Sequence, residues 1–347
     1  MPVVSRRSLL AVALAGAAAT LASCAASPSP SASPAPGTAA PSTGGASASA
    51  AALRIGICQI VSHPSLDAIR QGFKDGMKAA GYAEGQAVTY DEQNPQGDQA
   101  TLTSIAGTFK SQELDLVLAI TTPAAQAMAQ AITDRPIVFA GVTDPVSTKL
   151  VASWDAPGGN LTGTSDFPPI VAQLALVKRV APAAKTVGMI YSSSEANASV
   201  QVDLAKAAAA KAGLTLVTKG IVNSSEVQQA AEALAADAFF VSNDNTVVSA
   251  IESVIQVAEQ RKVPVIASDP DSLKRGATAA YAVDQYRMGY NAAKIAVRIL
   301  AKGQKPAAIP VEKQTDLQLG VNLAAAKRIG LTLPADLVAE ATTKIES

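Results

Sequence analysis

Histidine is almost absent from this chain of 347 residues, in which His63 is the single example. A Ser-His-Asp arrangement or an imidazole-rich metal centre would have to be built around that one side chain. The sequence also has no Gly-x-Gly-x-x-Gly or Walker-type loop and no Cys/His spacing suited to zinc. We therefore expect no cofactor, no metal and no enzymatic activity. An enzyme that uses paired carboxylates as acid and base stays open as an alternative.

Cysteine and net charge are also scarce. The chain has two cysteines, Cys24 and Cys58, and the second lies in an apolar run where we expect a buried small hydrophobe. Lys plus Arg and Asp plus Glu both number 28. This balance gives no reason to expect nucleic acid as a partner.

No charged residue occurs between Arg7 and Arg54. Arg6-Arg7 precede an apolar run that ends in Leu21-Ala22-Ser23-Cys24, which is typical of a bacterial lipoprotein export signal. The pattern predicts removal of residues 1–23 and acylation of Cys24. The run is too short to span a bilayer stably, so a plain membrane-spanning anchor is the weaker alternative. The Arg pair also fits a twin-arginine motif, and the export route stays open.

Residues 24–52 consist almost wholly of Ala, Ser, Pro, Gly and Thr after the cysteine. Such a segment cannot bury enough apolar surface to offset its ordering entropy, so we expect a disordered tether. The signal and the tether together predict an extracytoplasmic protein that is held at the cell membrane by lipid on Cys24.

The body that follows, residues 53–347, is about 295 residues long and can form two separate cores. Short β-branched apolar runs alternate with Ala-rich segments of helical period, which is typical of parallel sheets flanked by helices. Strands are predicted at 53–61, 87–92, 115–121 and 136–142, with helices at 64–80, 98–110 and 123–132.

The same rhythm restarts after a Gly- and Pro-rich stretch at residues 157–160. Further strands are predicted at 185–191, 214–221, 237–242, 263–267 and 277–283. A helix at 285–302 and strand-like stretches at 308–312 and 315–322 remain as a final portion that could cross back. The fold class is therefore α/β, with two doubly wound parallel-sheet lobes.

Polar residues follow most of the predicted strands, and ligands of open parallel sheets collect outside these carboxyl ends. The candidate binding residues in these positions are Gln59, His63, Thr121, Thr122, Ala124, Thr143, Asp144, Ser193, Ser194, Glu195, Asn197, Asp244, Asn245 and Asp269.

Three of these positions have ordinary structural alternatives. Thr122 before Pro123 suits the N-cap of a helix, whose first amides could bind a carboxylate or bind nothing. Ser192 and Glu195 are spaced as a capping box. His63 could cap the helix that begins at Pro64.

Carboxylates at strand ends or in the lobe connections are a second set of candidates. They are Asp144, Asp166, Asp244, Asp269 and Asp284. Any one of them could pair with a ligand ammonium group, or it could instead cap a helix or brace a loop.

Several short segments occur together in an order and spacing that carry a resemblance over essentially the whole body. They are His63-Pro64-Ser65-Leu66-Asp67, Asn94-Pro95-Gln96-Gly97-Asp98, Thr122-Pro123-Ala124-Ala125-Gln126, Val142-Thr143-Asp144-Pro145, Pro157-Gly158-Gly159-Asn160-Leu161-Thr162-Gly163, Ser165-Asp166, Ser193-Ser194-Glu195-Ala196-Asn197 and Asp244-Asn245-Thr246. In these segments the chain resembles the ABC-transporter substrate-binding lipoproteins of the tryptophan/tyrosine-uptake type, which have the fold of type I periplasmic binding proteins.

The resemblance implies two lobes joined by a three-stranded hinge, with residues 53–163 and 285–311 in the first lobe and 164–284 and 312–347 in the second. It implies a monomer that closes over a small ligand, expected to be an amino acid, with aromatic amino acids among the candidates, and passes it to an ABC permease and its ATPase. Thr121, Thr122 and the amide of Ala124 would bind the ligand carboxylate. One of Asp166, Asp244 or Asp284 would bind its ammonium group.

An aromatic ligand would need a stacking partner. The candidates near strand ends or crossovers are Trp154, Phe167, Tyr191, Tyr281 and Tyr286. A nucleoside, a sugar or a branched-chain amino acid remains an alternative ligand, and a tethered enzyme remains the rival class.

Overall fold

The computed structural model describes residues 51–347. The export signal, Cys24 and nearly all of the predicted tether lie outside these described residues. No helix within residues 51–347 combines the length and the apolar character that crossing a membrane requires.

The first lobe of the described chain is built on a parallel sheet in the order β11-β5-β4-β3-β1-β2. Its strands are β1 Leu53–Gln59, β2 Val88–Gln93, β3 Leu116–Ile120, β4 Ile137–Ala140, β5 Leu161–Ser165 and β11 Glu312–Lys313. β3, β4 and β5 are buried along their whole length, because helices cover both faces of the sheet.

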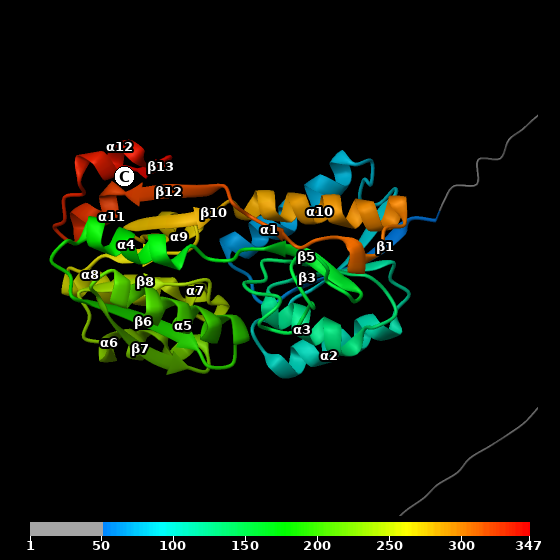
Figure 1. The fold of residues 1–347 in the computed structure, drawn as a ribbon, viewed down its shortest axis with the longest axis horizontal. Helices are drawn as coiled ribbons and strands as arrows, with labels where there is room; N and C mark the ends of the chain where they lie inside the picture. Colours follow the sequence, from blue (N-terminus) through cyan, green and yellow to red (C-terminus); the bar gives the residue numbers. More distant parts are fainter. Residues whose placement is uncertain (1–50) are drawn as a thin grey trace, which may run out of the picture. The chain divides into compact units, whose positions relative to one another are not determined.

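The second lobe is built on a sheet in the order β13-β12-β10-β9-β8-β6-β7, also drawn from the described residues. Its strands are β6 Thr186–Ser192, β7 Thr215–Ile221, β8 Ala238–Val241, β9 Val265–Ala267, β10 Ala279–Val283, β12 Leu317–Asn322 and β13 Thr343–Ile345. These strands run parallel to their neighbours except where β10 meets β12. The predicted α/β fold class with two parallel-sheet lobes is confirmed (Figure 1).

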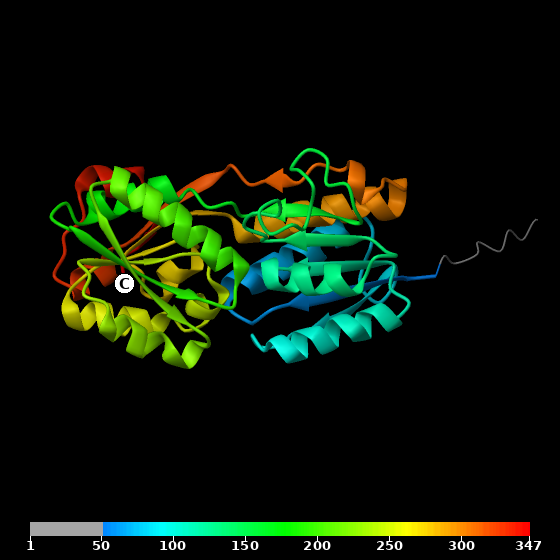
Figure 2. The same cartoon turned by 60° about the horizontal axis from the view of Figure 1, so that its bottom comes forward.

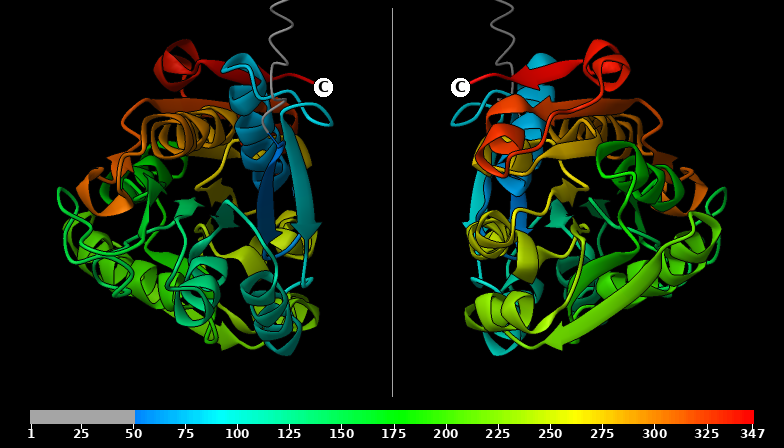
Figure 3. Two further views of the ribbon diagram at one scale, coloured as in Figure 1. Left: turned by 90° about the vertical axis from the view of Figure 1, so that its right-hand side faces the viewer. Right: turned by 90° about the vertical axis from the view of Figure 1, so that its left-hand side faces the viewer.

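The helices alternate with the strands along most of the chain. They are α1 Pro64–Ala79, α2 Gln99–Ser111, α3 Thr122–Ala131, α4 Ile170–Val180, α5 Ala196–Lys211, α6 Val227–Ala233, α7 Asn245–Ser249, α8 Ile251–Arg261, α9 Asp271–Arg275, α10 Gln285–Lys302, α11 Leu323–Arg328 and α12 Ala335–Glu340, with 3₁₀ turns at Ser224–Glu226 and Pro306–Ala308. The end-on views show α1 and α10 together on one side of the first lobe, with α2 and α3 on the other (Figure 3).

The chain passes between the two sheets in three segments of the described structure. They join β5 to α4, β10 to α10 and β11 to β12. Two of these connecting segments are visible between the lobes, one in green and one in orange (Figures 1 and 2). The first sheet extends two residues past each expected lobe boundary, because β5 runs to Ser165 and β11 pairs with it at Glu312–Lys313.

The predicted strands agree with the observed ones to within a few residues, with one exception, and the observed strands β5 and β13 were not predicted. The stretch 308–312 was expected to be strand-like, but it includes the end of a 3₁₀ turn, and the strand starts at Glu312. β5 was not predicted at all, because Leu-Thr-Gly-Thr-Ser reads as part of a Gly-rich connection. Gly163 is required there, since a Cβ atom at this position would lie 2.0 Å from the carbonyl oxygen of Phe139.

Helices α1 and α10 pack unusually closely because glycine lies at their contact. A Cβ atom on Gly72 would lie 2.0 Å from the Tyr286 carbonyl oxygen, and one on Gly289 would lie 1.8 Å from the Ile69 carbonyl oxygen. The contact matters for function because α1 and the start of α10 both carry side chains that reach the space between the lobes.

We expect Gly72→Ala to lower the free energy of unfolding by about 1–3 kcal/mol, because the new methyl group overlaps a backbone carbonyl that cannot rotate away. Gly107→Ala is the matched control. Gly107 lies within α2, and a Cβ atom there would meet no described atom within 4 Å. Its substitution should raise the unfolding free energy by about 0.5–1 kcal/mol. Urea denaturation measures both, and equal effects of the two substitutions would contradict the packing argument.

Candidate functional site

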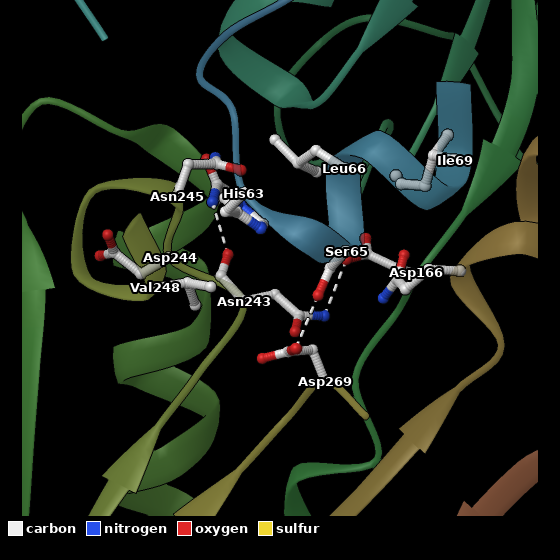
Figure 4. Close-up of a pocket in the computed structure, with 13 residues that line it drawn as sticks. His63, Ser65, Leu66, Ile69, Asp166, Asn243, Asp244, Asn245, Val248 and Asp269 are labelled. Atoms are coloured by element: carbon white, nitrogen blue, oxygen red, sulfur yellow. Dashed lines mark hydrogen bonds between the residues drawn. The ribbon is translucent and has the colours of Figure 1, made fainter. Parts of the chain in front are cut away.

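A cavity of about 30 Å³ lies between the carboxyl ends of the two sheets. Figure 4 shows the side chains that line it. They are His63, Ser65, Leu66, Ile69 and Gly141 from the first lobe, Asp166 from the first connecting segment, Asn197, Asn243, Asp244, Asn245, Val248 and Asp269 from the second lobe, and Gln285 at the start of α10.

The register of the first sheet explains which residues meet at the cavity. Ile120 pairs with Ala140, and Ala140 pairs with Thr164, so three strands end side by side. Adjacent strands are about 4.8 Å apart. Thr121, Gly141 and Ser165 therefore follow one another across the sheet edge, with the glycine in the middle, and Asp166 comes directly after Ser165.

Asp166 is a buried carboxylate whose hydrogen bonding is incomplete. Its Oδ2 atom accepts a hydrogen bond of 2.7 Å from the Asn243 side-chain amide. Its Oδ1 atom is buried and has no partner among residues 51–347. Burial raises the pKa of Asp166 to about 6. An oxygen of this kind is suited to receive a hydrogen bond from a cation.

The other candidate aspartates accept hydrogen bonds that stabilise the local structure. Asp244 accepts hydrogen bonds from the backbone N–H groups of Ser192 and Val247. Burial and the nearby charge of Glu195 raise the pKa of Asp244 to about 8. Asp284 caps α10 through the N–H of Arg287. Asp244 therefore braces a loop and Asp284 caps a helix, which are the structural roles given above as alternatives to ligand binding.

Asp144 and Asp269 are bonded in the same manner. Asp144 accepts from the N–H groups of Val146 and Ser147, and Asp269 accepts from Ser272. Among the candidate aspartates of the described chain, Asp166 alone has a buried oxygen without a partner.

Glu195 does not form the capping box that its spacing with Ser192 suggested. It is the N-cap residue of α5 without a side-chain cap among the described atoms. Its carboxylate instead accepts hydrogen bonds from Asn197, Asn245 and Thr246. Glu195 therefore orders the loop after β8 and places Asn245 at the cavity.

Thr121 and Thr122 were predicted to bind a carboxylate at the start of α3. Thr121, not Thr122, is the N-cap residue, and its side chain makes no cap bond within the described structure. Both hydroxyls are buried without partners among residues 51–347. Thr121 also has φ of 91°, a strained conformation for a β-branched residue, and such strain concentrates at functional sites.

His63 lies at the N-cap position of α1, where its side chain makes no cap bond within the described structure. The capping role is therefore wrong for the imidazole. Both ring nitrogens are buried and have no partner in the described part of the chain. Burial lowers the pKa of His63 to about 4, so the ring is neutral at neutral pH.

Several predicted site residues lie near the cavity without lining it. They are Gln59, Thr121, Thr122, Ala124, Thr143, Asp144, Ser193, Ser194, Glu195 and Asp284. Ser194 and Glu195 line a neighbouring cavity of about 100 Å³, which shares Asn245 with the first. Gln59 donates to Asp67 and to the Val61 carbonyl, so its amide supports the loop before α1.

The predicted aromatic candidates do not line this cavity in the described structure. Trp154 and Phe167 pack edge to face at 6.2 Å, and Lys313 lies 3.8 Å above the Trp154 ring. The apolar wall is aliphatic instead, and it was not predicted, because Leu66, Ile69 and Val248 read as ordinary helix residues. Ser65 and Leu66 could have been predicted to line the site, because they lie in the first helical turn that follows a strand end.

Cys58 is buried and forms no disulfide within the described chain, as expected of a small hydrophobe in β1. Burial raises the pKa of its thiol to about 12. Residues 51–347 contain no group of three or more His, Cys, Asp or Glu side chains that could hold a metal ion.

Comparison with known proteins gives concordant results. A family model described as ABC transporter substrate binding protein matches residues 54–345. The tyrosine-binding protein of Clostridioides difficile (strain R20291) is 42% identical over 270 residues, which are 77% of this chain and 78% of that protein. Solved structures of solute-binding proteins at 16–18% identity share the fold predicted above, that of type I periplasmic binding proteins.

Two solved structures with higher sequence identity to this chain differ in whether a ligand is bound. The ABC domain from Streptococcus pneumonia in complex with L-Trp has a TM-score of 0.82 at 37% identity, covering 85% of this chain and 100% of that one. The ligand-free, open structure of a substrate-binding protein with adhesive properties from Clostridium difficile has a TM-score of 0.65 at 39% identity, covering 85% and 99%.

One hydrogen bond joins the two lobes directly at the cavity. The Ser65 hydroxyl at the start of α1 donates to Asp269 after β9, at 2.6 Å. Both residues are buried, so solvent competes weakly for this bond. It stabilises the arrangement in which the lobes touch.

We expect Ser65→Ala to shift the population toward separated lobes by about 10- to 150-fold, since hydrogen bonds to charged groups contribute about 1.5–3 kcal/mol. Single-molecule fluorescence transfer between labels on α2 and α8 measures the shift. Ser272→Ala is the control, because it removes another hydroxyl from Asp269 within one lobe. If both variants leave the interlobe distance distribution unchanged, the bond does not hold the lobes together.

Proposed function

Because the chain belongs to the ABC transporter substrate-binding protein family, we propose that it captures a free amino acid between its lobes for delivery to an ABC permease. The observation that carries this proposal is the buried oxygen of Asp166 at the cavity, which has no hydrogen-bond partner among residues 51–347. A protonated α-amino group would complete the hydrogen bonding of that carboxylate and remove the penalty of burying its charge.

The start of α3 suits the other end of an amino acid. The unpaired hydroxyls of Thr121 and Thr122 and the first amides of α3 lie at a positive helix end, where a carboxylate is stabilised. Thr121 is two strands from Asp166, and Gly141 lies between them without a side chain. A ligand whose α-carbon sits over Gly141 would present its two charged groups to the two sides.

The relatives support an amino-acid ligand. The similar protein from Clostridioides difficile is named for tyrosine, and the streptococcal structure contains L-Trp. The TM-score of this structure is higher with the L-Trp complex (0.82) than with the ligand-free open structure (0.65). The sequence identities to the two proteins are nearly the same, at 37% and 39%. We infer that the described arrangement is the closed, ligand-binding one.

We propose that the receptor works outside the cytoplasm, at the membrane. ABC substrate-binding proteins act outside the cytoplasm, and a lipid on Cys24 with residues 25–52 as tether would keep the receptor beside its permease. We propose a monomer that binds without turnover. A carboxylate-based enzyme would instead consume its ligand, which chromatography of the ligand after long incubation detects.

A calorimetric panel of amino acids, nucleosides and sugars tests the ligand class. We expect heat from at least one L-amino acid and none from its N-acetylated derivative, because acetylation removes the ammonium group. Binding of a nucleoside or a sugar, with no amino acid bound, would overturn the proposal.

Asp166→Asn should weaken amino-acid binding by about 30-fold or more, since it removes the charge of a buried pair without changing its shape. Asp284→Asn is the control, because Asp284 caps α10 and does not line the cavity. Affinity that survives Asp166→Asn would remove Asp166 from the site.

The pH dependence has a defined sign. Because the ligand requires ionised Asp166 and the pKa of this carboxyl is about 6 before binding, affinity should fall below pH 6, by up to about tenfold per unit. The slope should be missing in Asp166→Asn. Calorimetry between pH 4.5 and 7.5 measures it, and a flat wild-type profile would count against Asp166.

Thr122→Val should weaken binding by about tenfold, because it removes a hydroxyl from the carboxylate site and keeps the shape of the side chain. Thr108→Val on the exposed part of α2 controls for the general effect of the replacement. Unchanged affinity of Thr122→Val would exclude its hydroxyl as a ligand contact.

A further inference from the structure

The His63 imidazole is, with the Asn197 side-chain oxygen, a polar group of the cavity that recognition of an amino-acid backbone leaves unexplained. It is 8% exposed, it lines the cavity, and neither nitrogen has a partner among residues 51–347. A neutral imidazole has one hydrogen-bond donor and one acceptor. Buried polar groups without partners are rare in native proteins, and each needs an explanation.

The charged groups around His63 do not supply that explanation. Asp269, Asp67, Asp271 and Arg275 act on the ring through space, and burial outweighs them and keeps it uncharged. The carboxylate of Asp269 bonds to Ser65 and Ser272. His63 thus presents a neutral donor and acceptor to the cavity.

The position of His63 fixes which part of a ligand it would meet. His63 follows β1, whereas Asp166 follows β5, three strands away in the sheet order. At about 4.8 Å per strand the two strand ends are roughly 14 Å apart. Figure 4 shows the two residues on different sides of the cavity, with Leu66 drawn between them across the view and Ile69 above Asp166.

Leu66 and Ile69 of α1 form an apolar wall of this cavity, and Val248 lines it from the second lobe. A ligand with its ammonium group on Asp166 would lay an apolar side chain along this wall and bring the tip of that side chain toward His63. At His63 the lining of the cavity changes from apolar to neutral polar.

We propose that His63 determines specificity by hydrogen bonding to a neutral polar group at the end of an otherwise apolar ligand side chain. A phenol hydroxyl or an indole N–H meets this requirement, and phenylalanine or leucine does not. The inference rests on the proposed function, because it takes the ligand to be an amino acid held at Asp166.

The expected discrimination is large, because a site built to bond a hydroxyl rejects the analogue that lacks it, in favourable cases by about 10⁴- to 10⁵-fold. We expect the wild-type protein to bind tyrosine at least about 30-fold more tightly than phenylalanine. For tryptophan the matched analogue is 3-benzothienylalanine, in which sulfur replaces the indole N–H.

Calorimetry on the wild type and on His63→Leu tests the proposal. His63→Leu should reduce the tyrosine-to-phenylalanine ratio to about threefold or less and leave phenylalanine affinity within about threefold of wild type. His63→Gln, which keeps a donor and an acceptor, should restore part of the ratio. A change in folding alone would lower both affinities together, which thermal melting of each variant checks.

The outcomes separate this inference from the proposed function. A wild-type protein that binds no amino acid overturns both. A wild-type protein that binds tyrosine and phenylalanine, and tryptophan and its sulfur analogue, with equal affinities overturns the role of His63 and leaves the amino-acid proposal intact. A ratio that His63→Leu does not change also overturns the role of His63.

Discussion

The site depends on one constraint, which is that two parallel sheets direct their carboxyl ends into the same space. Strand ends carry the polar residues of this fold, so closing the lobes buries carboxylates, hydroxyls and an imidazole together. Some of these groups bond to one another, as Ser65 does to Asp269. Asp166, Thr121, Thr122 and His63 keep atoms without a partner in the described chain, and each such atom costs about 1–3 kcal/mol when it is buried.

This imbalance couples binding to closure. A ligand that pairs the remaining atoms lowers the free energy of the closed form and leaves that of the open form nearly unchanged, so it shifts the population by its differential affinity. The direct bond between Ser65 and Asp269 supplies part of the closing free energy without ligand. The close contact of α1 with α10 keeps the start of α1, with His63 and Ser65, in a fixed place relative to Gln285.

The sequence allowed much of the fold to be predicted, because β-branched apolar runs and Ala-rich helical segments are local signals. It did not reveal β5, whose Thr-Gly-Thr-Ser composition suits a strand only because Phe139 packs against Gly163. The rule of strand ends identified His63 and Asn197 as candidates, and Asp166 was a candidate because it lies in a predicted connection between the lobes. It could not show that Asp166 is the aspartate with an unpaired oxygen, because its partner Asn243 is 77 residues away in the chain.

Small-angle X-ray scattering of ligand-stripped protein, with and without saturating tyrosine, tests the central claim most directly. If unpaired polar atoms of the cavity make closure depend on the ligand, the radius of gyration should fall when tyrosine is added. The fall should be much smaller at the same tyrosine concentration in Asp166→Asn. A radius that stays the same while calorimetry shows tyrosine bound would contradict the coupling of binding to closure.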